Sequence, residues 1–405
     1  MTPDPAGSPP GARPPAAPLP PAGPASAVAG EPAGAGQVEG PHPPAGPSAP
    51  AVRGPAGPRT APGPRGADTP GRAGRGLRGA ASFGAGAALL AAVCLAALCL
   101  GEPVLSPAGL VSAIGRPDSL EALVVGEVRL PRMLLGLAAG VALGCAGLLL
   151  QEALRNPLAV PELLGVSAGA AGVTAAITVF GLPVAAGLVP AFALAGAVGG
   201  GALCLAVARR AGDAASVLLT GAAVSTALTG GVYAITSMAD RFELGLVFRY
   251  LMGSLVGAGW EELAMVAPWL LGAAPLLVLC LPLLGVLGLG DDAASALGLD
   301  PARARLAVLA TAAVLVAVTV AACGPVSWVG FLAPMLARRL HPHAEPRTRL
   351  LWSGLLGGLV TVGADLAART ALHPIELPLG AFTGSVGIVG GLLLLRAAGA
   401  KAVPR

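Results

Sequence analysis

Ten apolar runs follow one another along the chain between residues 82 and 396, separated by glycine, proline and charged residues. Most contain the ~17 to 25 residues that a helix needs to cross a hydrocarbon core about 30 Å thick. One run is shorter, so we expect it to be tilted or half-inserted. The runs lie at 82–101, 131–151, 162–180, 184–208, 214–237, 262–288, 302–322, 326–340 (the short one), 350–372 and 378–396.

The composition agrees with a membrane protein. Hydrophobic residues make up 55% of the chain and charged residues 11%, whereas soluble domains carry about 25% charged residues. Aromatic residues are only 3% while glycines number 60, so the helices must pack through small side chains. We therefore predict an all-α integral membrane protein with about ten transmembrane helices.

Residues 1–79 differ from the rest of the chain. They hold 21 of the 40 prolines, two leucines, and no Phe, Tyr, Trp or Ile, so they cannot bury a core. They also lack the continuous apolar stretch of a signal peptide. We predict a disordered Pro/Ala/Gly-rich N-terminal extension at 1–79, or a wrongly assigned start, followed by a polytopic domain at 80–400.

The distribution of basic residues predicts the orientation. Six arginines between Arg53 and Arg78 precede the first span, which places the N-terminus in the cytoplasm. With an even number of spans, both termini of this multi-pass protein lie on the cytoplasmic side of the cytoplasmic membrane. Beyond the tail, this topology leaves twelve basic residues inside and six outside, and the outer ones include Arg129, Arg132 and Arg369.

These outer arginines have two interpretations. Arg129 and Arg132 flank Leu-Pro at the start of the second span, where they either anchor the helix to lipid headgroups or dock a partner. Arg369 follows Asp365 by four residues, so the two form a structural pair on one face of the ninth span. Arg369 could also face an acidic partner outside the membrane.

The second span ends in an irregular segment. Pro157 excludes a helical conformation for Asn156, and Pro161 suits the first turn of the next helix. Non-helical backbone at the membrane edge persists only where protein covers it or where it lines a wet cavity. We predict a translocation gate or pathway wall here, with a plain re-entry turn as the alternative. The candidate residues are Gln151, Asn156, Pro157, Leu158 and Pro161.

A second non-membrane segment lies at 284–305. Asp291 can cap a short helix that Gly298 ends, and Asp300-Pro301 can open the next helix with a cap and a first-turn proline. An ordered helix pair on the cytoplasmic side offers a contact for a soluble partner. A plain connection between two spans would need only a few polar residues.

The chain offers little for catalysis. A phosphate-binding P-loop needs Gly-Lys-Ser/Thr, and the only lysine, Lys401, is followed by alanine, so the chain is not a P-loop ATPase. The six cysteines stand singly in apolar runs as small fillers. We expect no metal site and no catalytic residue. Gly136, Gly140 and Gly144 recur every four residues, which is typical of close helix packing.

Several segments together resemble the FecCD-type permease family, which imports ferric siderophores, haem and cobalamin. The resemblance covers about residues 80–396 and keeps the order and spacing of the motifs. Met335 departs from the family's usual histidine, and Gly387-Ile-Val-Gly390 departs from its Gly-x-Pro-x-Phe. The matching segments are 129–132, 140–151, 155–170, 293–298, 324–334, 364–369 and 376–380.

The resemblance implies the type II ABC importer permease fold, as in cobalamin permeases. It implies a homodimer or heterodimer with a second permease, two ATPase subunits inside, and an extracytoplasmic substrate-binding lipoprotein outside. ATP and Mg would be bound by the partner ATPase, so we expect no cofactor in this chain. Membrane lipid surrounds the protein, and we expect no nucleic-acid partner.

The resemblance also assigns roles to residues. It implies that Arg129, Arg132 and Arg369 dock the binding protein. It implies a cytoplasmic coupling loop at about 288–303 that contacts the ATPase. The residues assigned to that contact are Asp291, Asp292, Ser295, Gly298, Leu299, Asp300 and Arg303.

We therefore expect the membrane-spanning permease subunit of an ABC importer that moves a ferric siderophore, not an enzyme. A cobalamin or haem permease is the alternative within the family, and Arg155-Asn156-Pro157 favours siderophores by resemblance. An ion-coupled secondary transporter would need intramembrane acids, of which Asp365 is the one clear case. An enzyme acting on membrane substrates would need a cluster of polar groups that the sequence lacks.

Overall fold

The structure is a computed structural model that describes residues 72–116, 118–210, 214–372 and 375–399. The chain divides into two units, 1–68 and 69–405, and the first lies outside the described residues. Most of the predicted N-terminal extension is therefore outside them too. The first helix begins at Arg72, ahead of the predicted start at residue 80.

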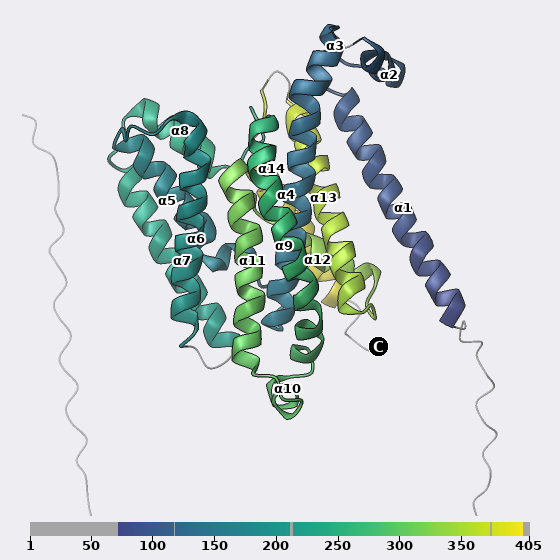
Figure 1. The fold of residues 1–405 in the computed structure, drawn as a ribbon, viewed down its shortest axis with the longest axis vertical. Coiled ribbons are helices and arrows are strands. Elements are labelled where there is room, and N and C mark those ends of the chain that lie inside the picture. The colour runs from purple at the N-terminus through teal and green to yellow at the C-terminus, as the bar shows by residue number, and fades with distance from the viewer. Residues whose placement is uncertain (1–71, 117, 211–213, 373–374, 400–405) are drawn as a thin grey trace, which may run out of the picture. The chain divides into compact units, whose positions relative to one another are not determined.

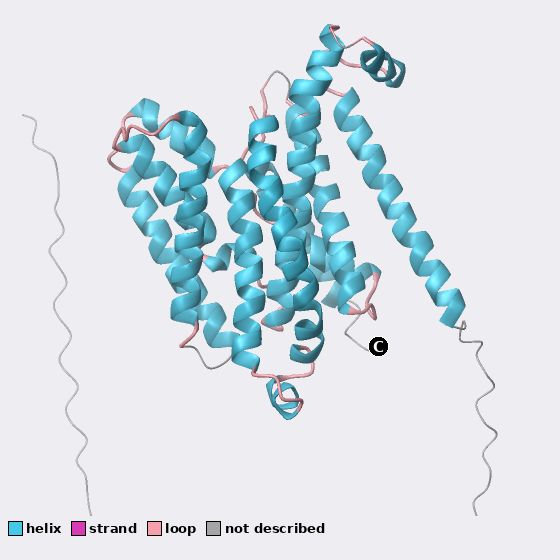
Figure 2. Ribbon diagram, in the orientation of Figure 1, coloured by secondary structure: helices cyan, strands magenta, loops and turns pink. Residues whose placement is uncertain are grey.

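Every regular element among the described residues is a helix, as predicted (Figure 2). The long helices are α1 (Arg72–Cys99), α4 (Leu130–Ala153), α5 (Val166–Val179), α6 (Val189–Ala208), α7 (Ala214–Thr236), α9 (Trp260–Leu287), α11 (Pro301–Cys323), α12 (Val329–Leu340), α13 (Pro346–Thr370) and α14 (Leu379–Gly399). The short ones are α2 (Pro107–Gly115), α3 (Leu120–Leu123), α8 (Arg241–Leu251), α10 (Asp291–Ala296), the π-helix η1 (Val124–Arg129), and the 3-10 helices η2 (Pro161–Leu164) and η3 (Ala186–Leu188).

The predicted spans match these helices in order. Each of the ten runs overlaps one long helix, and seven of the described helices are long and apolar enough to cross a membrane. Two further helices are apolar, α5 with 14 residues and α14 over its stretch Leu379–Leu393. With 12 residues, α12 rises only about 18 Å, which agrees with the half-inserted run expected at 326–340. The count of ten crossings is therefore approximate.

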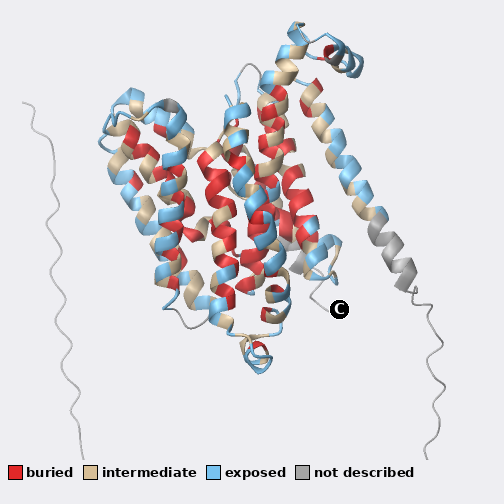
Figure 3. Ribbon diagram, viewed as in Figure 1, coloured by how far each residue is buried: buried red, intermediate tan, exposed pale blue. Residues whose placement is uncertain are grey.

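The centre of the bundle is made by α4 and α11. In the spans that contain them, 72% of the most apolar window is buried, against 11% in α1 and in α7 (Figure 3). Because the outer helices are mostly apolar and exposed, they must meet lipid or another protein. Figure 1 places α10 at one end of the bundle and α2, α3 and α8 at the other.

Glycine allows α4 and α13 to touch through their backbones. A methyl group on Gly140 would overlap the carbonyl of Gly357, and one on Gly144 would overlap the carbonyl of Ser353. The predicted packing role of these two glycines is confirmed, since small residues let helices in lipid approach closely. A Cβ at Gly136 would lie 2.9 Å from a side-chain carbon of Leu255 instead.

The ends of the helices at the α10 turn agree with the predicted caps in part. Asp300 accepts the N–H groups of Ala302 and Arg303 at 3.1 and 3.2 Å and so caps α11, as expected. Gly298 follows α10 with a left-handed φ of 81°. The predicted cap at Asp291 is wrong, because Gly290 occupies that position and arginines engage the Asp291 carboxylate.

Candidate functional site

Arg129 lies at the end of the bundle that carries α2 and α3, and its side chain points into the protein. Its guanidinium donates to the carbonyl oxygens of Leu98, Cys99 and Pro103 at 2.7, 3.1 and 2.6 Å. The residue is only 3% exposed. These carbonyls belong to the last turn of α1 and the turn after it, where helical carbonyls lack intrahelical partners. Arg129 therefore fixes the end of α1 in this conformation.

Arg132, the third residue of α4, binds two carboxylates. Its Nε lies 3.2 and 3.1 Å from the two oxygens of Asp365, and its Nη2 lies 2.9 Å from Oδ1. Its Nη1 donates to Glu376 at 3.0 Å. The Arg132 and Asp365 side chains are 11% and 9% exposed, so this pair is largely removed from solvent.

The predicted Asp365–Arg369 pair is replaced by the Arg132–Asp365 pair. Arg369 donates instead to the carbonyl oxygen of Ala97. The spacing of four residues puts Asp365 and Arg369 on one face of α13, but α4 brings a second arginine to that same face with a geometry that engages both carboxylate oxygens. Three predicted docking arginines thus meet at one end of the bundle.

Glu376 belongs to this cluster although sequence reasoning gave it no role. It stands in the motif at 376–380, and its side chain is 41% exposed. The signal that could have identified it is an acid directly before an apolar span on the same side as three arginines. Docking by Arg129, Arg132 and Arg369 stays a prediction.

The break after α4 forms a tight turn at the other end of the bundle. The side-chain oxygen of Asn156 accepts the N–H of Leu158 at 2.9 Å, and the backbone carbonyl of Asn156 accepts the N–H of Ala159 at 3.1 Å. Gln151 is buried and donates to the Ala159 carbonyl at 3.3 Å. Pro161 packs against Gly330 at the start of α12. Protein therefore covers one side of the irregular backbone.

The other side of the turn is open. A depression of about 700 Å³ lies between the end of α4 and the start of α7, and Arg155 and Asn156 line it. Leu158 is exposed, whereas Gln151 and Pro161 face the buried side. The predicted gate residues thus lie around one turn. Asn156 lines the depression, and Gln151 and Pro161 lie on the buried side of the turn.

Ion pairs attach the end of α4 to its neighbours. Glu152 lies 2.9 Å from Arg349 of α13 and 3.8 Å from Arg338 of α12. Arg338 also donates to the side chain of Gln151. Ion pairs with α12 and α13 therefore fix the end of α4.

The α10 turn has two faces. Asp292, Ser295, Gly298, Asp300 and Arg303 are exposed, while Ala294 is buried and Leu299 is half-buried. Asp291 faces inward, where it lies 3.0 Å from Arg155 and 2.9 Å from Arg305. Of the residues predicted to contact an ATPase, most are thus available to a partner, and Asp291 is engaged within the chain.

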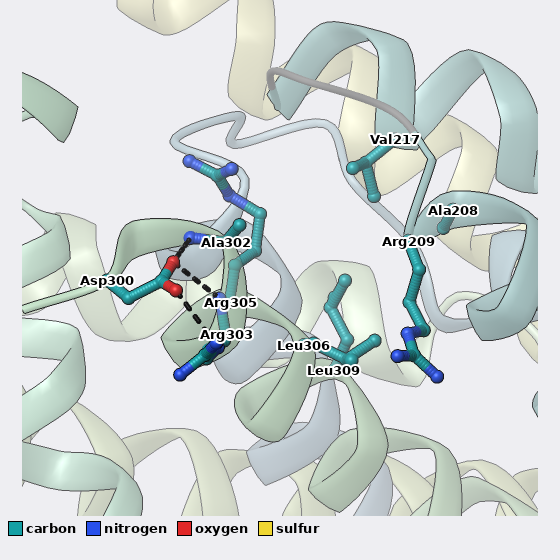
Figure 4. Close-up of a pocket in the computed structure, with 9 residues that line it drawn as sticks. All are labelled: Ala208, Arg209, Val217, Asp300, Ala302, Arg303, Arg305, Leu306 and Leu309. Atoms are coloured by element: carbon teal, nitrogen blue, oxygen red, sulfur yellow. Dashed lines mark hydrogen bonds and ion pairs between the residues drawn. The ribbon is translucent and has the colours of Figure 1, made fainter.

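A cavity of about 270 Å³ lies beside this turn, between α6, α7 and the first turns of α11. In Figure 4, Leu306 and Leu309 lie between Arg209 on one side and Arg303 on the other. The Arg303 Nε is 3.1 Å from an oxygen of Asp300. The lining of the cavity therefore combines apolar leucine side chains with charged side chains.

Within the described part of the chain, no group of three or more His, Cys, Asp or Glu side chains is placed to hold a metal ion. All six cysteines are unpaired.

Comparison with known proteins identifies related transport proteins. A family model described as "FecCD transport family" matches residues 89–396. The Fe(3+)-citrate import system permease protein YfmE of Bacillus subtilis is 32% identical over 299 residues, which cover 73% of this chain and 89% of that protein. The cobalamin import system permease protein BtuC of Halobacterium salinarum is 36% identical over 286 residues, covering 70% and 75%.

A solved structure has the same fold. It is an inward-facing conformation of a transporter assigned to the metal-chelate type of ABC transporters, and it superposes with a TM-score of 0.68. The two chains are 26% identical, and the match covers 78% of this chain and 98% of the other. The agreement in fold extends across nearly all of the solved chain.

Proposed function

The chain belongs to the FecCD transport family, and from that membership we propose that it is the permease subunit of an ABC importer for a ferric siderophore. It is a multi-pass membrane protein. The bacillus relative is named for Fe(3+)-citrate import, which favours a ferric chelate over cobalamin as the substrate. Both termini would lie in the cytoplasm.

The observation that carries the proposal is the difference between the two ends of the bundle. Three arginines gather at the end that carries α2 and α3. The helix α10, with its exposed face, belongs to the other end, and Figure 1 shows these helices at opposite ends of the bundle. An importer needs a contact for an external carrier and a contact for an internal motor, on opposite sides of the membrane. The positions of these two sets of side chains support that division.

The internal motor would be a pair of ATPase subunits that bind ATP and Mg. The exposed side chains Asp292, Ser295 and Arg303 of the coupling loop would contact them. ATP binding can shift the permease only by its different affinity for two conformations, so this contact must differ between them. The permease itself would bind and release the chelate without reacting with it.

A second permease subunit would cover the exposed helices. Tyr233 on α7 and Phe242 and Phe248 on α8 are 65%, 75% and 57% exposed. Large aromatic side chains in that number favour a protein partner at this face. Between the two copies, the chelate would pass to the depression beside Asn156.

The external carrier would be a substrate-binding lipoprotein. Exposed ion pairs contribute about 0.2–1 kcal/mol each, so several docking arginines would set orientation and association rate more than affinity. Arg129 would first have to leave three carbonyl oxygens to meet a carboxylate on this partner. Arg132 would have to leave Asp365 and Glu376. Arg369 is half-buried and donates to the Ala97 carbonyl, so it is the better candidate.

A secondary transporter is the weaker alternative. It needs an intramembrane acid that can bind and release an ion, and Asp365 already has a close cation partner in Arg132. A cobalamin or haem permease remains the alternative within the family, since one relative is named for cobalamin import.

The test is uptake in cells that lack this gene, with and without a plasmid that restores it. Radioactive iron is supplied as a ferric siderophore, and labelled cobalamin is supplied to parallel cultures. Restored iron uptake that stops when ATP is depleted is the expected result. Restored cobalamin uptake alone would support the alternative within the family. Uptake abolished by a protonophore at constant ATP would overturn the ABC importer.

A further inference from the structure

Three charged side chains connect the α10 turn to the break after α4. The Arg305 Nη2 lies 2.9 Å from both oxygens of Asp291, and the Arg155 Nη2 lies 3.0 Å from Oδ1 of the same carboxylate. Asp291 is the first residue of α10, Arg305 lies in the first turns of α11, and Arg155 belongs to the segment after α4. One carboxylate therefore joins three elements.

Arg305 is the fixed member of this group. Its side chain is 4% exposed, and its Nε donates to the carbonyl oxygen of Ala153, the last residue of α4, at 3.2 Å. That carbonyl is among the helix-end acceptors without intrahelical partners, and a cation there also interacts favourably with the helix dipole. A buried arginine that engages a carboxylate through both oxygens is costly to separate from it.

Arg155 is the exchangeable member. Its side chain is 43% exposed and that of Asp291 is 33% exposed, so water can replace this contact at little cost. The backbone of Arg155 has a φ of 47°, a left-handed conformation that is unfavourable for a residue with a side chain.

Arg155 also borders the gate. It directly precedes Asn156 and Pro157, and it lines the depression between the end of α4 and α7. On the other side of Asp291, the residues Asp292 and Ser295 of α10 face away from the bundle. A force on that outer face of α10 therefore reaches the turn at Asn156 through one side-chain contact.

We propose that Asp291 is a positioning residue that transmits movement of α10 to the gate turn, with Arg305 as its anchor and Arg155 as the contact that forms and breaks. This inference rests on the proposed function, because it needs an ATPase that moves α10. It assigns Arg305 a role as an anchor, which the sequence did not predict. It also gives Asp291 a role inside the chain in place of direct ATPase contact.

The first experiment uses the complete transporter in proteoliposomes and measures ATP hydrolysis and ferric-siderophore uptake together. Arg155→Gln should keep ATP hydrolysis while uptake per ATP falls about fivefold or more, the size of a typical coupling between sites. Arg155→Lys keeps the charge and should restore most of the ratio. Arg347→Gln, at an exposed cytoplasmic position away from α10, is the matched control and should leave the ratio unchanged.

The double variant Arg155→Gln/Asp291→Asn distinguishes a linkage from two separate effects. If both residues act through one contact, either substitution already removes that contact. Uptake per ATP in the double variant should therefore be no lower than in the worse single variant. Losses that multiply, or an unchanged ratio in Arg155→Gln, would overturn the linkage.

A second experiment is independent of the transported chelate. Cysteines introduced at 155 and 291, in a chain whose native cysteines are replaced, are crosslinked with and without trapped nucleotide. The yield should differ between the two states, whereas cysteines at 152 and 349, the neighbouring pair between α4 and α13, should give equal yields. Equal yields at 155 and 291 would overturn the exchangeable contact. Absence of ferric-siderophore uptake by the unmodified transporter would instead count against the proposed substrate alone.

Discussion

Arg132 and Asp365 are 233 positions apart in the sequence, and yet the guanidinium of one engages both carboxylate oxygens of the other at 2.9 to 3.2 Å. Removing the arginine would leave a nearly buried carboxylate without its cation, which costs about 3–5 kcal/mol. We predict that Arg132→Met lowers the thermal unfolding temperature in detergent strongly. Asp365→Asn should lower it less, because Arg132 keeps Glu376 as a partner.

The control for this pair is Arg116→Met, at an exposed arginine on the same side of the bundle. It should leave the unfolding temperature nearly unchanged. The double variant Arg132→Met/Asp365→Asn should recover part of the loss, because the buried charge is gone. A double variant as unstable as the sum of both single variants would show that the pair contributes no coupling energy.

Arg129 makes a different prediction, because its partners are carbonyl oxygens. Its planar guanidinium reaches Leu98, Cys99 and Pro103 at once, and a lysine ammonium cannot reproduce that fork. We predict that Arg129→Lys costs about 1–3 kcal/mol, the penalty for leaving buried polar groups unsatisfied. The measurement is thermal unfolding in detergent, together with binding of the proposed external carrier to the variant that remains folded.

The result separates the two roles of Arg129. A variant that unfolds earlier but binds the carrier with unchanged affinity would assign Arg129 to the end of α1. Unchanged stability with weaker carrier binding would contradict the inward geometry and favour docking.

The packing of α4 against α13 predicts an unusual response to alanine. Alanine in a helix interior is normally better than glycine by about 1 kcal/mol. At Gly144 the added methyl would overlap the Ser353 carbonyl, so we expect Gly144→Ala to destabilise by roughly 1–3 kcal/mol. At Gly199 on α6 a Cβ meets nothing within 4 Å, so Gly199→Ala should be neutral or stabilising. Equal effects of the two substitutions would argue against backbone contact at Gly144.

Elements set by local chemistry were predictable from the sequence. The apolar runs locate the long helices in order, because a span must be apolar over the thickness of the bilayer. Asp300 followed by Pro301 predicts the start of α11, since a cap and a first-turn proline act within a few residues. The stripe of Gly140 and Gly144 predicts a close contact without naming its partner helix.

The partners of charged residues could not be predicted. Spacing along one helix pairs Asp365 with Arg369, but the choice of Arg132 depends on how α4 lies against α13. The same holds for Asp291, whose carboxylate lies beside Arg155 and Arg305 while Gly290 takes the cap position of α10. Burial of Arg129 follows from carbonyls at the end of α1, which no local pattern reveals.

The turn after α4 provides the last prediction. The Asn156 side chain accepts the N–H of Leu158 at 2.9 Å, an arrangement in which a short side chain replaces a backbone acceptor and fixes the turn. We predict that Asn156→Ala loosens the turn and lowers siderophore uptake about fivefold or more if the turn belongs to the coupled gate. Asn156→Asp keeps the accepting oxygen and should retain most uptake. Because the residue is only half-buried and borders the open depression, thermal stability should change little in either variant. Equal uptake by the alanine and aspartate variants would mean that the accepting oxygen of Asn156 does not shape the pathway.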